Sequence, residues 1–148
     1  MLKIRVINGP NLNMLGVREP EIYGKQTLND IEDLLRIEAQ ALDIQLDFFQ
    51  SNHEGEIIDS IHGAYMENFD GLIINPGAYT HYSYAIRDAV SSVKIPCIEV
   101  HLSNIYVRDE FRKNSVVAPV CTGQISGFGS DSYIAALYVL YRRLNKKS

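Results

Sequence analysis

Residues 2–11 read LKIRVINGPN, an almost continuous apolar and β-branched run that stops abruptly at the turn sequence NGPN. An apolar run bounded by turn residues in this way predicts a buried strand from Leu2 to Ile7 that leads into a loop. The same kind of run recurs along the chain, and it predicts further strands at Ile44 to Phe49, Gly71 to Ile74, Pro96 to Val100 and Val116 to Val120.

Helical periodicity fills the intervals between these strands. Thr27 and Asp30 resemble a capping box, and apolar residues follow at helical spacing as far as Leu42. Three more amphipathic helices are predicted, around Ile57 to Tyr65, Ala85 to Val93 and Asp131 to Leu144. Because strand and helix alternate without linker or repeat, we expect a single domain over residues 1–148. Its fold class is α/β, a flavodoxin-like open five-stranded parallel sheet in the order 2-1-3-4-5 with helices on both faces.

Composition narrows the class of protein further. The chain has 148 residues, of which 46% are hydrophobic and 22% charged, which is typical of a soluble globular domain. The net charge of −4, without a basic stripe, argues against a nucleic-acid partner. No stretch approaches the roughly 20 apolar residues of a membrane span, and the N-terminus lacks the pattern of a secretory signal. We therefore expect a cytoplasmic protein with neither a nucleic-acid nor a membrane partner.

Cysteine and histidine spacing gives no sign of a metal site. Cys97 and Cys121 are far apart and outside any CxxC motif, so we expect two small buried hydrophobes rather than a disulfide. The four histidines show no spacing of the zinc type, and no metal is expected.

Open parallel sheets bind ligands beyond the carboxyl ends of their strands. Hydrogen-bonding side chains follow three of the predicted strands, namely Asn11, Asn13, Asn75, His81, Glu99, His101, Ser103 and Asn104. No lysine directly follows a strand, which argues against Schiff-base chemistry in this cleft.

Glu99 and His101 are the clearest candidates for acid-base chemistry. They are two residues apart on a predicted strand, so their side chains leave the same face. A carboxylate in that position can hold an imidazole in one tautomer and stabilise its protonated form. A structural Glu-His pair at a sheet edge is the alternative. We favour the functional role because an unpaired glutamate near the end of a buried strand would be costly. The role of His81 stays open between a helix-start hydrogen bond and a ligand contact, whereas His53 and His62 are assigned to structure.

The segment from residue 16 to 24, GVREPEIYG, is framed by glycines and has no helical or strand period. Such loops can act as lids that close over a ligand, although a plain surface loop fits the composition equally well. In a lid, Arg18 and Tyr23 could meet over the cleft, where the guanidinium would favour the phenolate. Arg108 and Arg112 could contact a ligand or belong to a solvated turn.

Together, these motifs resemble type II 3-dehydroquinate dehydratase over essentially the whole chain. The resemblance is carried in order by NGPNLNMLGVREPEIYG (8–24), QSNHEG (50–55), INPGAYTH (74–81) with AIRDA (85–89), IPCIEVHLSN (95–104), EFRKNS (110–115) and SGFGSDSY (126–133). It implies a shikimate-pathway hydro-lyase that converts 3-dehydroquinate to 3-dehydroshikimate by anti elimination through an enolate. Neither a Schiff base nor a metal or cofactor is implied. The family also implies a homo-oligomer, a dodecamer built from trimers.

The resemblance implies a role for each matching residue. Tyr23 would be the base that removes the proton from C2, and Arg18 would favour its phenolate. His101, oriented by Glu99, would protonate the departing C1 hydroxyl. Asn11, with a bound water, would stabilise the enolate oxygen.

Substrate contacts are implied in the same way. Asn75, His81 and Arg112 would bind hydroxyl groups, and Leu102 with Ser103 would bind the carboxylate. Asp88 is expected to reach the site of a neighbouring subunit. Tyr82 and Tyr84 stand where smaller residues are expected in this family.

A non-catalytic flavodoxin-like module that binds a small anionic ligand or flavin is the alternative function. Flavin binding predicts a phosphate-cradling loop rich in Ser, Thr and Gly after the first strand. This chain has GPNLN there instead.

Overall fold

The computed structural model describes residues 1–17, 21, 24–107 and 110–146. Its centre is one parallel sheet with strand order β2-β1-β3-β4-β5, which confirms the predicted fold class and topology. The strands are β1 (Leu2–Asn8), β2 (Ile44–Gln50), β3 (Gly71–Asn75), β4 (Cys97–His101) and β5 (Gly123–Ser126).

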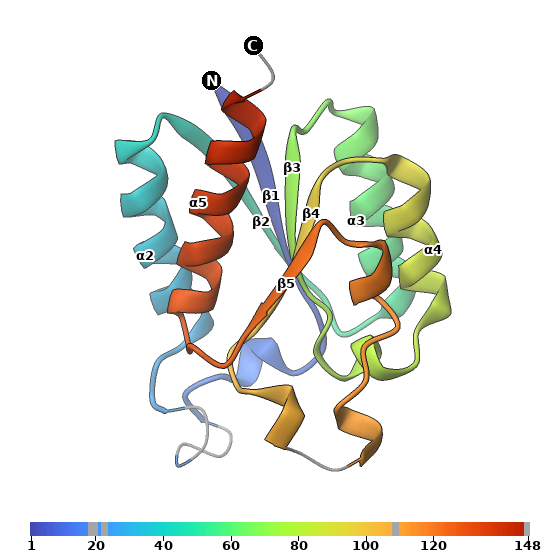
Figure 1. Cartoon of the computed structure of the whole chain (residues 1–148). Coiled ribbons are helices and arrows are strands. Elements are labelled where there is room, and N and C mark those ends of the chain that lie inside the picture. The colour runs from blue at the N-terminus through green and yellow to red at the C-terminus, as the bar shows by residue number, and fades with distance from the viewer. Residues whose placement is uncertain (18–20, 22–23, 108–109, 147–148) are drawn as a thin grey trace.

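Helices cover both faces of the sheet. Helices α2 (Leu28–Ala41) and α5 (Asp131–Asn145) lie on one face, and α3 (Glu54–Met66) and α4 (Tyr84–Val93) lie on the other (Figure 1). The predicted capping box of α2 is present. Thr27 Oγ1 accepts from the Asp30 N–H at 3.1 Å, and Asp30 Oδ2 accepts from the Thr27 N–H at 2.9 Å. No helix among the described residues has the length and apolarity to cross a membrane.

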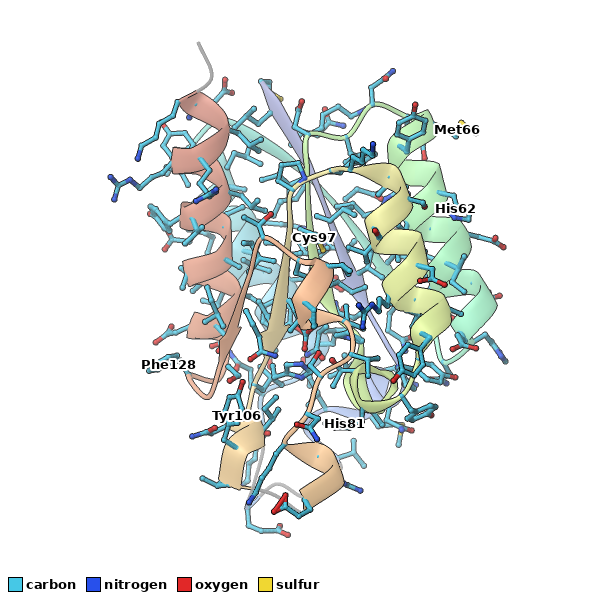
Figure 2. All side chains as sticks on the ribbon, turned by 45° about the vertical axis from the view of Figure 1, so that its right-hand side comes forward. His62, Met66, His81, Cys97, Tyr106 and Phe128 are labelled. Atoms are coloured by element: carbon cyan, nitrogen blue, oxygen red, sulfur yellow. The ribbon has the colours of Figure 1, made fainter. Side chains whose placement is uncertain are left out.

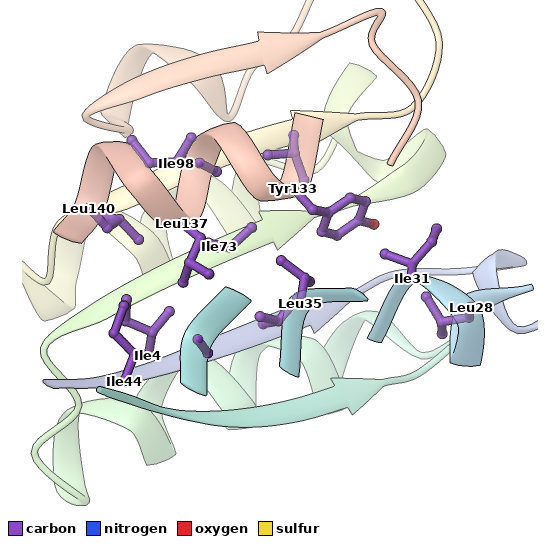
Figure 3. Packing of buried hydrophobic residues seen from close by; sticks show 14 of the residues in the cluster. Ile4, Leu28, Ile31, Leu35, Ile44, Ile73, Ile98, Tyr133, Leu137 and Leu140 are labelled. Carbon is purple, nitrogen blue, oxygen red and sulfur yellow. The ribbon is translucent and has the colours of Figure 1, made fainter. Parts of the chain in front are cut away.

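The sheet separates two hydrophobic cores because successive side chains of a strand point to opposite faces. Ile4 and Val6 of β1 pack with the apolar sides of α2 and α5, as Figure 3 shows for that core. Ile7 packs on the other face, against α3 and α4. Burial of each such aliphatic side chain contributes about 1.5–3 kcal/mol to the stability of the fold. Packing on both faces therefore holds the strands, and with them their carboxyl ends, in a fixed register.

The prediction of a fifth strand at Val116 to Val120 is wrong. Residues Ala118–Val120 form a 3-10 turn, and the strand that pairs with β4 is the later GQIS segment of β5. Two features explain this difference. Pro119 has no backbone N–H to give to a strand ladder. The fully buried Val117 instead anchors the turn in the core beneath α3 and α4.

The loops after β1 and β3 are packed tightly together. The Gly9 N–H donates to the Asn75 carbonyl at 2.8 Å, and Gly77 has a φ of 60° and lies against Pro10. A Cβ at Gly9 would lie 2.6 Å from the carbonyl oxygen of Pro76, closer than atoms tolerate. The two loops can therefore meet only with glycine at position 9.

Gly9→Ala should lower the free energy of unfolding by about 1–3 kcal/mol, the usual cost of forcing extra atoms into a packed site. Denaturant titration followed by circular dichroism measures this loss. Gly55→Ala is the matched control, because position 55 lies in helix α3 with nothing within 4 Å of the new Cβ. The control should be neutral or slightly stabilising. An equal loss in both variants would contradict the close approach of the two loops.

Candidate functional site

The carboxyl ends of β1, β3 and β4 open into one pocket with a volume of about 100 Å³. Figure 2 shows His81 and Tyr106 at this end of the molecule, on the short 3-10 segments that follow β3 and β4, while His62 and Met66 lie on α3 away from it. The lining includes Pro10, Asn11, Leu12, Leu15, Asn75, Gly77, Ala78, His81, His101, Leu102, Ser103, Ile105 and Arg112.

Asn11 enters the pocket from the loop after β1. Its backbone has a φ of 69°, in the left-handed region that asparagine adopts more readily than most residues. Its N–H donates to Asn52 Oδ1 at 3.0 Å, which ties this loop to the end of β2. The conformation turns the chain back into a short 3-10 helix at Leu12–Met14, whose Leu12 is buried.

Asn75 at the end of β3 is held at both ends of its amide group. Its Oδ1 accepts from the Gly77 N–H at 3.1 Å, and its Nδ2 donates to the Tyr133 hydroxyl at 2.9 Å. Tyr133 is completely buried in α5 and donates in turn to Asn8 Oδ1 at 2.6 Å. Burial raises the pKa of Tyr133 far above its usual value, so the phenol stays neutral and can donate this bond.

Glu99 and His101 of β4 form the acid-base pair that their spacing predicts. His101 Nε2 lies 2.5 Å from Glu99 Oε2. Glu99 has no exposed surface and His101 is 7% exposed, so both are shielded from bulk water while His101 still lines the pocket. Electrostatic interactions between buried groups are screened far less by salt than those at the surface.

Hydroxyl and amide donors surround the Glu99 carboxylate. Thr80 Oγ1 donates to Oε2 at 2.7 Å, Ser115 Oγ donates to Oε1 at 2.8 Å, and Gln124 Nε2 donates to Oε2 at 3.0 Å. Burial alone would raise the pKa of Glu99, but the hydrogen bond and charge of His101, followed by Thr80 and Ser115, outweigh it and lower the pKa. The carboxylate is therefore ionised at neutral pH despite its burial.

Most of the predicted site residues meet at this pocket. Those that line it are Asn11, Asn75, His81, His101, Leu102, Ser103 and Arg112, with Glu99 directly behind His101. His81 Nδ1 lies 2.7 Å from the Asn114 carbonyl oxygen. Asp88 is exposed on α4 and does not line the pocket of its own chain. Arg18, Tyr23 and Arg108 lie outside the described residues.

Other residues singled out in the sequence lie away from the pocket. His53 and His62 are exposed at the start and on the surface of α3, and Tyr82 and Tyr84 are exposed beside the start of α4. Tyr82 packs edge-on against Tyr79, with ring centroids 5.8 Å apart.

Four residues around the pocket were missed by sequence reasoning, namely Thr80, Ser115, Gln124 and Tyr133. Each acts through a long-range hydrogen bond to a residue that was found. The sequence around each of these residues does not indicate a hydrogen bond to a residue so far away in the chain. Burial of Glu99 could have predicted that donors must surround it, but not which ones.

Cys97 and Cys121 are free thiols with sulfur atoms 4.0 Å apart, Cys97 buried and Cys121 partly so. Within the described ranges, no group of three or more His, Cys, Asp or Glu side chains is arranged to hold a metal ion. The polar groups available to a ligand are those of the pocket itself.

An open parallel sheet with helices on both faces and a buried acid-base pair at its carboxyl edge defines this chain as an α/β protein of the doubly wound, flavodoxin-like class. The family model for dehydroquinase class II matches residues 2–141. The chain therefore belongs to the class II dehydroquinase family.

Individual relatives agree with this assignment. The 3-dehydroquinate dehydratase of Caldicellulosiruptor saccharolyticus is 65% identical over 140 residues, covering 95% of this chain and 97% of the relative. The enzyme of that name from Bacillus subtilis is 60% identical over 136 residues, covering 91% of each chain. The crystal structure of the type II dehydroquinase from Butyrivibrio crossotus superposes with a TM-score of 0.92 at 54% identity, covering 94% of this chain and 97% of that one.

Proposed function

We propose that this chain dehydrates 3-dehydroquinate to 3-dehydroshikimate, a step of the shikimate pathway, by anti elimination through an enolate. The observation that carries the proposal is the buried Glu99-His101 pair at the wall of a pocket with mixed polar and apolar lining, in a chain of this family. The reaction needs a base for an acidic C–H bond, a means of holding an enolate, and an acid for a poor leaving group.

His101 is suited to the role of the acid. Glu99 occupies Nε2, so Nδ1 is the ring nitrogen left to act on a ligand in the pocket. A buried carboxylate at one nitrogen stabilises the imidazolium that must form before the other nitrogen gives its proton away. His101 would thus protonate the C1 hydroxyl as it leaves as water, and Glu99 would keep its charge throughout.

The pocket also carries groups suited to binding the substrate. Asn11 would stabilise the enolate oxygen through a bound water. The Asn75 amide, His81 and Arg112 would bind hydroxyl groups. Leu102 and Ser103, directly after β4, would bind the carboxylate. The fixed orientation of Asn75 between Gly77 and Tyr133 supports its role, because a preorganised amide loses little entropy on binding.

The base would be Tyr23, with Arg18 favouring its phenolate, both carried by a lid around residues 16–24 within a single domain over residues 1–148. The support for these roles is the family motif that the two residues match. C2 lies next to a ketone, so a phenolate is strong enough to remove its proton once the enolate is held in place.

An enolate route fits the pocket better than a Schiff base. Across the part of the chain that the structure describes, no lysine lines the pocket. A Schiff-base mechanism requires an amine within reach of the substrate carbonyl. The family further suggests a cytoplasmic enzyme, assembled as a dodecamer built from trimers, in which Asp88 contacts a neighbouring site. Sedimentation of the purified protein tests that assembly.

Mixing the protein with 3-dehydroquinate should produce the ultraviolet absorbance of a conjugated enone at a rate proportional to enzyme concentration. Borohydride added together with substrate should leave the activity intact, because no imine forms. A folded protein that binds the substrate without producing the enone would favour a binding module. Inactivation by borohydride, with the label on a lysine, would rule out the enolate route.

A further inference from the structure

The hydroxyl of Ser115 is locked as a hydrogen-bond donor by the turn that follows it. Ser115 Oγ accepts from the Val117 N–H at 3.2 Å and from the Ala118 N–H at 2.9 Å. A hydroxyl oxygen has two lone pairs, so these bonds fill its accepting capacity. Its single hydrogen must then go outward, either to Glu99 Oε1 at 2.8 Å or to Thr80 Oγ1 at 2.7 Å.

The neighbouring hydroxyl of Thr80 is constrained as a result. Ser115 cannot accept from it, so the Thr80 hydrogen goes to Glu99 Oε2, which lies 2.7 Å away. When the Ser115 hydrogen points to Oε1, both hydroxyls donate to the carboxylate. When it points to Thr80, it strengthens the bond that Thr80 donates to Oε2. Gln124 Nε2 adds a third donor at 3.0 Å.

These donors decide where the proton of the acid-base pair resides. Hydrogen bonds to a charged carboxylate are stronger than those to a neutral carboxyl group, so these donors favour the ionised form of Glu99 over the protonated one. The carboxylate therefore stays unprotonated, and the hydrogen between Glu99 Oε2 and His101 Nε2 belongs to the imidazole. The lowered pKa of Glu99 agrees with this geometry.

We propose that Ser115 is a positioning residue for the reaction: the turn after it fixes its hydroxyl as a donor that keeps Glu99 ionised and aimed at His101. The inference rests on the proposed function for its effect on turnover. The same inference gives a role to the segment Val116 to Val120, which the sequence predicted to be a strand. The N–H groups of Val117 and Ala118 in this segment donate to the Ser115 hydroxyl and so orient it. In a strand, these backbone N–H groups would instead donate hydrogen bonds to a neighbouring strand.

Few other charges act on this carboxylate. Among the described residues, His101 and Cys97 interact electrostatically with Glu99. Cys121 contacts Cys97, and His81 and Arg112 line the same pocket as His101. Serine and alanine are both uncharged. Replacing Ser115 by alanine therefore removes the hydrogen bond to Glu99 without altering the charges around it.

Ser115→Ala should lower kcat by about tenfold while KM changes by less than about twofold, as expected for the loss of one bond to a charged group that does not touch substrate. Loss of the donor raises the pKa of Glu99, so the carboxylate becomes protonated at a higher pH. The acid limb of the pH profile of kcat should therefore move to higher pH by about one unit. Carbon-detected NMR titration of the Glu99 carboxyl in the free protein should show the same upward shift. Thr80→Val, which keeps the shape and removes the other hydroxyl, should act in the same direction.

Ser83→Ala is the matched control. Ser83 also donates to a carboxylate, that of Glu54, and accepts a backbone N–H, that of Ile86, but has no bond to Glu99. It should lose comparable stability and keep the pH profile. An unmoved Glu99 titration in both Ser115→Ala and Thr80→Val, or an equal shift in Ser83→Ala, would overturn the inference. If the wild type fails to dehydrate 3-dehydroquinate, the proposed function falls, and the NMR titration still decides the role of Ser115.

Discussion

His101→Ala should lower kcat by about 10²- to 10⁴-fold, the usual contribution of a positioned general acid. Hydroxide is a poor leaving group, and His101 is the imidazole that the fold places in the pocket with a buried carboxylate at its far nitrogen. KM should change little, because other residues are proposed to bind the substrate carboxylate and hydroxyls. The ultraviolet enone assay, run over a range of substrate concentrations, separates the two effects.

His62→Ala is the control for this loss. His62 is exposed on α3, away from the pocket, and its removal should leave turnover at the wild-type level. A His101→Ala variant that is folded and still turns over within about threefold of the wild type would show that another group protonates the leaving hydroxyl.

Tyr23→Phe should reduce turnover by about 10³-fold or more while leaving substrate binding within a few-fold of the wild type. Phenylalanine keeps the ring and removes only the oxygen that would accept the C2 proton. Substrate affinity, measured by calorimetry on the inactive variant, should therefore stay close to the KM of the wild type. Such a split between kcat and binding is the mark of an interaction made only in the transition state.

Tyr65→Phe provides the matched control, since Tyr65 is exposed on α3 and the same atom is removed. Its kinetics should be those of the wild type. Turnover by Tyr23→Phe at more than about a tenth of the wild-type rate would remove this tyrosine from the role of base.

The fold was predictable to the extent that each element has a local pattern. The capping box at Thr27 and the apolar runs before NGPN and NPG located helix α2 and the buried strands β1 and β3, and strict alternation then determined the topology. The edge strand β5 was misplaced. Its four residues, GQIS, have little apolar signal, whereas Val116 to Val120 has much. Tertiary packing of Val117 and the missing N–H of Pro119 decided the outcome.

The site was predictable where its residues directly follow strands. Glu99 and His101 share a face because of their spacing, and the structure brings their side chains together. The residues that hold them could not be found in this way. Ser115 reaches Glu99 across 16 positions and Gln124 across 25, from segments whose place depends on the completed fold.

The central claim is that one group removes the C2 proton and a different group expels water. Proton NMR of 3-dehydroquinate in deuterated water, with each variant as catalyst, tests it most directly. The account predicts that His101→Ala still exchanges the C2 proton for deuterium far faster than it forms the enone, because Tyr23 can make and reprotonate the enolate. Tyr23→Phe should do neither. Exchange that survives in Tyr23→Phe, or vanishes in His101→Ala together with dehydration, would contradict a stepwise reaction with separate base and acid.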